Sequence, residues 1–204
     1  GQLQKLKMLS IPFIGAHRFN WEKAVDYLSE LPDLETLDIE EGAFDRIPKN
    51  IKELKKLKSL RAGSAGLDLF GSIEHLAELP KLEVLKFDDN RLGKIPSNIS
   101  KLKNLRVLHL NSGELEALPE VIGDLTELEE LYLYDNKLKT LPNSIVKLKK
   151  LETLELSDNP LEFLPERFSE LESLKSLGIS GAVDVNKVLE VALKIPTLAD
   201  LELY

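Results

Sequence analysis

Few residues in this sequence have the chemistry for catalysis or metal binding, and they are widely spaced. The three histidines are His17, His75 and His109, and none has a second histidine at the spacing of a local metal-ligand pair. The chain contains no cysteine, which excludes thiol catalysis, cysteine-ligated metals and disulfides. It also lacks a GxSxG nucleophile elbow, a GxxxxGK phosphate-binding loop and a GxGxxG turn.

Two pairs of adjacent acids are the remaining candidates for chemistry. Glu40/Glu41 and Asp88/Asp89 could in principle coordinate calcium or act as acid and base. On an open surface, however, little desolvation separates the pKa values of such a pair. We therefore expect no catalytic residue, no bound metal and no cofactor, and we interpret the protein as a non-enzymatic one.

The spacing of leucine is the most regular feature of the chain. In the stretch LTELEELYLYDN, the positions Leu125, Leu128, Leu131, Leu133 and Asn136 are three, three, two and three residues apart. The step of two from Leu131 to Leu133 indicates a short strand, whereas the other steps fit neither a plain strand nor a plain helix.

This unit recurs along nearly the whole sequence. The second leucine of each unit serves as its marker: Leu6, Leu34, Leu57, Leu82, Leu105, Leu128, Leu151, Leu174 and Leu198. Successive markers are 28, 23, 25, 23, 23, 23, 23 and 24 residues apart. A fixed period in this range indicates a solenoid. We assign residues 1–204 to a single domain of about nine units.

The pattern LxxLxLxxNxLxxLPxxIxx resembles the leucine-rich repeat family, in its 23-residue form with a Leu-Pro or Ile-Pro step. The resemblance implies an α/β solenoid, a horseshoe with a parallel β-sheet on the concave face. Its convex side would carry mixed extended, 3-10 and helical segments. The resemblance also implies that the asparagine of each unit satisfies buried backbone groups. Asn90, Asn136 and Asn159 occupy that position, and other residues replace it at Ile14, Gly42, Ala65, Gly113 and Ala182.

Three convex segments have helical periodicity and a residue that can cap a helix. They are residues 21–28 capped by Asn20, residues 73–79 capped by Ser72, and residues 185–194 capped by Asp184.

Residues that flank the inward leucines of each strand should face the concave side. Eleven of these flanking residues are acidic and only Arg61 and Lys86 are basic. This face therefore accounts for the formal net charge of −8 of the whole chain. Such a surface would repel nucleic acid and anionic lipid and would attract a basic or mixed-charge protein partner. The alternative interpretation is that these acids only keep the sheet soluble.

An aromatic cluster favours binding over solubility. Tyr132 and Tyr134 alternate along one predicted strand, His109 lies one strand earlier, and Glu155 lies one strand later. Strands are about 4.8 Å apart, so these side chains can form one patch. The predicted partner-binding residues are Asp38, Glu40, Arg61, Lys86, Asp88, His109, Asn111, Glu130, Tyr132, Tyr134 and Glu155.

The sequence favours a protein-recognition module and leaves two alternatives open. One is a structural solenoid that forms oligomers through its open terminal coils, and the other is an intracellular scaffold or targeting domain of a larger protein. No apolar run is long enough for a transmembrane helix, so we expect no membrane insertion. The resemblance is to cysteine-free repeats found in many bacterial proteins, including surface and secreted ones, and in cytoplasmic scaffolds of the Ras-associated type. We expect a bacterial protein that is secreted or on the cell surface in preference to a cytoplasmic one.

Overall fold

A computed structural model of the chain describes residues 2–11, 20–39, 46–63, 67–180 and 184–203. Nine short strands in this part of the chain form one parallel sheet, and their order in the sheet is their order in the sequence. The strands are β1 Met8–Ser10, β2 Thr36–Asp38, β3 Ser59–Arg61, β4 Val84–Lys86, β5 Val107–His109, β6 Glu130–Tyr132, β7 Thr153–Glu155, β8 Ser176–Ile179 and β9 Asp200–Leu203.

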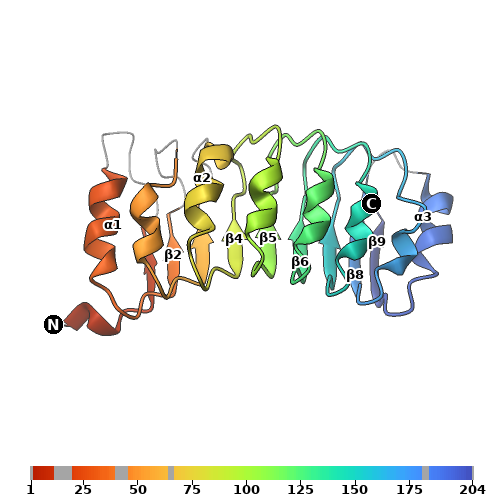
Figure 1. Ribbon diagram of the computed structural model, residues 1–204. Helices are drawn as coiled ribbons and strands as arrows, with labels where there is room; N and C mark the ends of the chain where they lie inside the picture. Colours follow the sequence, from red (N-terminus) through yellow and green to blue (C-terminus); the bar gives the residue numbers. More distant parts are fainter. Residues whose placement is uncertain (1, 12–19, 40–45, 64–66, 181–183, 204) are drawn as a thin grey trace.

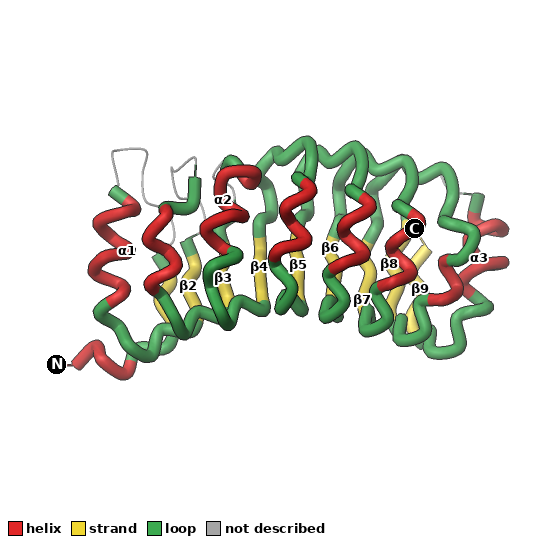
Figure 2. Tube along the Cα trace, in the orientation of Figure 1, coloured by secondary structure: helices red, strands yellow, loops and turns green. Residues whose placement is uncertain are grey.

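A layer of helical segments lies on one side of the sheet, and successive coils follow one another along a gently curved solenoid (Figures 1 and 2). The α-helices are α1 Trp21–Ser29, α2 Leu69–Leu76 and α3 Val185–Ala192. The 3-10 helices are η1 Gln2–Lys5, η2 Lys49–Glu53, η3 Ser97–Lys101, η4 Glu120–Asp124, η5 Asn143–Lys147 and η6 Phe168–Glu170. This arrangement confirms the predicted horseshoe with a mixed convex side.

The alternation within each strand explains why the sheet has one buried face and one open face. The middle leucine of each inner strand is buried, as Leu108, Leu131 and Leu154 show, while the residues on either side of it remain partly exposed. The predicted marker leucines from Leu34 to Leu174 are buried as well, two residues before their strands. Together these leucines form one apolar core that extends from coil to coil.

Two of the three predicted helices have the predicted cap. The Asn20 side chain accepts a hydrogen bond from the Lys23 N–H at 2.9 Å, at the start of α1. Asp184 accepts one from the Asn186 N–H at 3.0 Å, at the start of α3. Side-chain acceptors at this position satisfy backbone donors that have no partner inside the helix.

The prediction for the helix in the third unit was wrong about its start and its cap. Helix α2 begins at Leu69, and its cap is Asp68, which accepts a hydrogen bond from the Gly71 N–H at 3.3 Å. Ser72 lies inside the helix and is 0% exposed. Its hydroxyl donates to the Asp68 carbonyl at 2.6 Å and accepts from the Ile47 N–H at 3.0 Å, so it joins two coils.

The three asparagines at the repeat position are buried and bind backbone, as the resemblance implied. The Asn136 amide donates to the carbonyls of Leu110 and Leu133, both at 2.9 Å, and its oxygen accepts from the N–H groups of Gly113 and Leu115, both at 3.0 Å. Gly113 occupies the asparagine position of its own unit, and its backbone N–H donates to the Asn136 side chain of the next coil. The other replacements, Ile14, Gly42, Ala65 and Ala182, lie outside the described residues.

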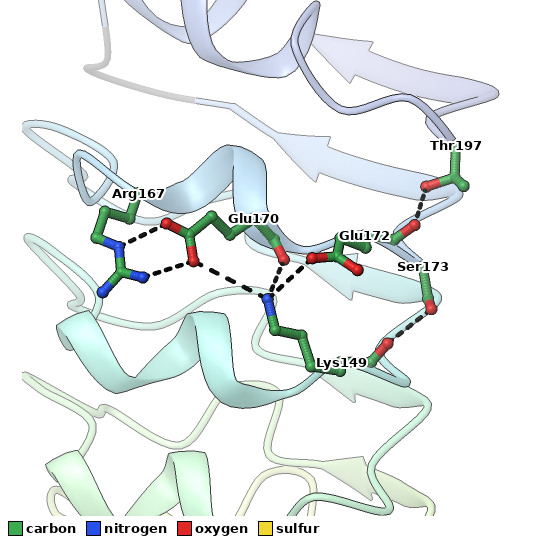
Figure 3. Close-up of polar contacts among 6 residues, drawn as sticks. All are labelled: Lys149, Arg167, Glu170, Glu172, Ser173 and Thr197. Atoms are coloured by element: carbon green, nitrogen blue, oxygen red, sulfur yellow. Dashed lines mark hydrogen bonds and ion pairs between the residues drawn. The ribbon is translucent and has the colours of Figure 1, made fainter.

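Side chains also connect coils along the edge that leads into the strands (Figure 3). Lys149 donates to the Glu170 carbonyl at 2.8 Å and lies 3.4 Å from the Glu172 carboxylate. The Ser173 hydroxyl donates to the Lys149 carbonyl at 2.6 Å, and the Thr197 hydroxyl donates to the Glu172 carbonyl at 2.9 Å. Hydrogen bonds of this kind hold successive coils in register.

Many bases along this edge form ion pairs with acids of a neighbouring coil. The pairs include Lys58–Glu35 at 2.8 Å, Arg106–Glu129 at 2.7 Å, Lys150–Glu127 at 2.5 Å and Lys175–Glu152 at 2.8 Å. Their side chains are partly exposed, so water and salt screen these pairs and each contributes little to stability. Because the charges of each pair cancel, the charge of the open face is determined by the residues that lie on it.

Candidate functional site

The third residue of each strand forms a row across the open face of the sheet. Parallel register places these residues side by side from one strand to the next. In order from β2 to β7 the row contains Asp38, Arg61, Lys86, His109, Tyr132 and Glu155. A second row is formed by the first residues of the strands and includes Glu130.

His109 and Tyr132 are in direct contact, in β5 and β6. Their ring centroids are 4.2 Å apart and the ring planes are inclined by 39°. The Tyr132 hydroxyl donates to the Glu130 carboxylate at 3.2 Å. Burial raises the pKa of Tyr132, and the negative charges of Glu130 and Glu155 raise it further. The phenol therefore stays neutral and keeps its hydrogen bond to Glu130.

Tyr134 does not lie on the strand, which corrects the expectation that both tyrosines alternate along it. Strand β6 ends at Tyr132, and Tyr134 follows two residues later with 44% of its surface exposed. Its backbone N–H donates to the Asn111 side chain at 2.8 Å. A hydrogen bond to Asp158 and the charge of that carboxylate raise the pKa of Tyr134. Tyr134 thus lies at the rim of the open face, towards Asp158.

Asp88 and Asn111 have a structural role in addition to any role in binding. The Asp88 carboxylate accepts a hydrogen bond from the Asn111 N–H at 2.9 Å and lies 3.6 Å from the His109 ring nitrogen. The side chains of Asp88 and His109 are each 16% exposed. Burial raises the pKa of Asp88, but the interactions with His109, the Asn111 N–H and Arg61 outweigh burial and hold that pKa below its ordinary value of 3.8.

The predicted set divides into two groups on the sheet. Asp38, Arg61 and Lys86 lie on β2 to β4, away from the tyrosines. His109, Tyr132 and Glu155 lie on the adjacent strands β5 to β7, and Glu130 and Tyr134 lie beside them. Glu40, also predicted, lies outside the described residues.

The predicted partner-binding set omits Ser157 and Asp158, which follow β7. Ser157 is 6% exposed, and its hydroxyl has no hydrogen-bond partner. Its N–H donates to Glu155 at 2.7 Å. The Glu155 carboxylate lies over Gly178 of the next strand, where a side chain would collide with it. A flanking serine looks unremarkable in sequence, and only its burial reveals the unsatisfied hydroxyl.

The loops that follow β4 to β6 line an open hollow of about 370 Å³. Its lining residues are Asp89, Arg91, Ser112, Glu114, Asp135, Asn136 and Lys137.

Within the part of the chain that the structure describes, no group of three histidine or acidic side chains is arranged to hold a metal ion. His75 is part of a structural contact, since its ring nitrogen lies 2.9 Å from the Ile47 carbonyl.

Comparison with known families shows where this architecture belongs. The model of the leucine-rich repeat family matches residues 80–138, 103–161 and 126–182, which together span half of the chain. The chain belongs to the leucine-rich repeat family. No curated protein sequence matches this leucine-rich repeat protein significantly.

Solved structures with the same fold come from several kinds of organism. Internalin C2 of Listeria monocytogenes has a TM-score of 0.71 at 19% identity, over 90% of this chain and 84% of that one. The Toll–Spätzle complex of Drosophila has a TM-score of 0.79 at 20% identity, over 98% and 27%. A leucine-rich repeat protein of Leptospira interrogans has a TM-score of 0.60 at 23% identity, and this chain spans 55% of it. These identities establish the fold alone.

No helix in the described part of this leucine-rich repeat protein is long and apolar enough to cross a membrane.

Proposed function

We propose that the protein is a non-enzymatic recognition module whose concave face binds another protein. The contact between His109 and Tyr132 on the open sheet, with Tyr134 exposed beside it, is the observation that carries this proposal. Exposed tyrosines cover apolar area at little entropic cost and are frequent binding hot spots. Solubility alone does not require them.

The sheet is large enough for a stable interface. Nine strands at a spacing of about 4.8 Å give an arc of roughly 40 Å. A standard interface buries about 800 Å² on each partner, which fits on this arc. One similar structure, from Drosophila, is the complex of Toll with Spätzle. It offers a precedent for protein binding by this fold.

The charges of the open face favour a basic or mixed-charge partner. Glu130, Glu155 and Asp158 surround the tyrosines, and the chain has a formal net charge of −8. A negative surface increases the association rate of a positive partner and disfavours nucleic acid and anionic lipid. The prediction of a secreted or surface-exposed bacterial protein rests on the sequence resemblance, because the similar structures come from bacteria and from Drosophila alike.

A paired pull-down tests the proposal. The native chain and the Tyr132→Ala/Tyr134→Ala variant are immobilised and exposed to extracts of host-cell surfaces and of bacteria, and retained proteins are identified by mass spectrometry. Tyr27→Ala is the matched control, because Tyr27 is 63% exposed on helix α1. We expect proteins that the native chain and the control retain and the double variant loses. Identical lists for all three proteins would contradict the proposal.

Self-association is the second candidate, because β1 and β9 each pair with a strand on one side only in the described sheet. Such free edges are able to pair with another chain. Light scattering that gives a mass above 23.0 kDa at rising concentration would favour this candidate. A constant monomer mass would leave recognition through the concave face as the better account.

A further inference from the structure

An open hollow of about 520 Å³ lies between the start of α2 and the extended segment that leads to η3. We call it the α2 hollow. Six of the side chains that line it are apolar: Leu67, Leu69, Phe70, Leu92, Ile95 and Pro96. Phe70 is 68% exposed. The volume is in the range of sites that hold a ligand, about 300–1,000 Å³. None of the described residues that line the hollow belongs to a strand, so it is separate from the concave face.

Two asparagines hold the walls of the α2 hollow in place. Asn98 of η3 donates to the Glu74 carboxylate of α2 at 2.8 Å, and Lys101 pairs with the same carboxylate at 2.6 Å. The buried Asn90 side chain accepts from the Leu67 N–H at 3.1 Å, which fixes the segment before α2. Because the free protein already holds both walls, a ligand does not have to form the hollow, and this lowers the entropic cost of binding.

The charged side chains that line the α2 hollow favour an acidic ligand. Arg91 and Lys94 are exposed bases, and Asp68 is the acid. Asp68 caps α2 and lies 3.5 Å from Arg46, so its charge is already balanced. The Arg91 side chain is 84% exposed and lies 3.7 Å from Glu114, and no described acid forms an ion pair with Lys94. The hollow is therefore locally positive in a chain whose formal net charge is −8.

We propose that the α2 hollow is a second interaction surface, which binds an acidic peptide segment of a protein partner. An aromatic or leucine side chain of that segment lies against Phe70, Leu92 and Pro96. An adjacent carboxylate of the segment accepts hydrogen bonds from Arg91 and Lys94. Nucleic acid and anionic lipid are disfavoured because they meet the negative charge of the whole chain, whereas a short segment meets the two bases. The α2 hollow and the proposed concave site therefore favour partners of opposite charge.

Selection from a displayed library of random twelve-residue peptides tests the proposal. The library is first depleted on the Phe70→Ser/Lys94→Gln variant and then selected on the native chain, so that the retained peptides depend on the α2 hollow. Both replaced side chains are exposed, so this variant should fold as the native chain does. The retained peptides should share an aspartate or glutamate next to a leucine or an aromatic residue. Retained peptides without a shared acid, or no enrichment over a selection without protein, would overturn the proposal.

The affinity of one selected peptide tests the charge contact. Replacing its acid by the corresponding amide should weaken binding to the native chain at least about fivefold. The same replacement should weaken binding to the Arg91→Asn/Lys94→Gln variant by less than about twofold, because the contact is already lost there. Asn tolerates the left-handed backbone at Arg91, where φ is 46°. Equal losses with the two proteins would show that the carboxylate does not meet these bases and would contradict the proposal.

Two control variants separate the α2 hollow from the rest of the surface. Phe163→Ser/Lys187→Gln makes the same change of side chains and charge elsewhere, because Phe163 is 53% exposed and Lys187 is exposed on α3. Tyr132→Ala/Tyr134→Ala alters the concave face only. Both variants should bind the selected peptides within about twofold of the native chain. A larger loss in either variant would place the peptides outside the α2 hollow and would overturn the proposal.

Discussion

Asn136 shows how much one side chain can contribute to a repeated fold. Its amide group bonds five backbone groups, the carbonyls of Leu110, Leu133 and Tyr134 and the N–H groups of Gly113 and Leu115. All five would be poorly hydrated without it, because they lie between packed coils. Asn90 and Asn159 repeat this arrangement in their own coils.

Asn136→Ala should lower the free energy of unfolding by about 2–5 kcal/mol, because it leaves buried donors and acceptors without partners. The midpoint of urea unfolding measures the loss. Asn143→Ala is the control, since Asn143 is exposed at the start of η5, and it should change stability by less than about 0.5 kcal/mol. Similar effects of the two substitutions would contradict the structural role of the repeat asparagine.

Asp88 makes stability depend on pH in the acid range. Its pKa is depressed in the folded protein, so the carboxylate stabilises the fold at pH values above its unfolded-state pKa, and this contribution is lost as the pH falls through the folded value. The Asp88→Asn variant should therefore lose less stability than the native chain from about pH 5 to about pH 2.

Urea unfolding at each pH measures this difference between the native chain and Asp88→Asn. Asn at position 88 keeps an acceptor for the Asn111 N–H, so the fold itself should persist. Asp200→Asn, which removes an exposed acid from β9, should follow the native pH profile. Parallel profiles for the native chain and Asp88→Asn would contradict a contribution of the Asp88 carboxylate to the pH dependence of stability.

The contact between His109 and Tyr132 was predictable from sequence, because a regular repeat places equivalent residues side by side in a parallel sheet. The orphaned hydroxyl of Ser157 was not predictable. Its burial and its lack of a hydrogen-bond partner depend on packing in the folded chain, which no periodicity encodes. The binding roles of these residues remain predictions.

The spacing of neighbouring coils is set where their convex segments touch. Gly123 in η4 is buried, and a Cβ atom there would collide with the backbone oxygen of Ser144 in η5. The equivalent position one repeat earlier is Ser100, whose hydroxyl donates to the Ser97 carbonyl at 3.1 Å on the surface. The contact between η4 and η5 is therefore closer at Gly123 than a side chain would allow.

Gly123→Ala should destabilise the fold by about 1–3 kcal/mol, since either coil must move to admit the methyl group. The control is Ser100→Ala at the equivalent position, which should cost less than about 1 kcal/mol. Denaturant unfolding of both variants measures the difference. A neutral or stabilising Gly123→Ala would mean that the two coils separate easily.

Helix positions were predicted well where one polar residue stands before the apolar periodicity, as Asn20 and Asp184 do. The prediction failed at Ser72, because Asp68 stands one turn earlier and can cap the same helix. The Ser72 hydroxyl instead accepts a hydrogen bond from the Ile47 N–H of the preceding coil. Local rules cannot distinguish these two uses of a serine, since the second depends on a residue in another coil.

At the scale of the whole molecule, one period along the sequence determines the order of the nine strands in the described part of the chain. Repetition alone accounts for the fold, because each coil buries its leucines against the next. It does not select a partner, which depends on the residues that vary between repeats. Among them are Tyr132 and Glu130 on β6, Tyr134 just after it, and Glu155 on β7, and the proposed recognition depends on these residues.

Oxidative footprinting by hydroxyl radicals tests recognition through the concave face most directly. The native chain is labelled alone and when saturated with a partner retained in the pull-down, and the oxidation of each side chain is measured by mass spectrometry. Tyr134, 44% exposed, and Tyr132 should be protected by the partner, whereas Tyr27 and Phe70, exposed on α1 and α2, should react as before. Protection of Tyr27 and Phe70 with unchanged Tyr132 and Tyr134 would contradict binding through the concave face.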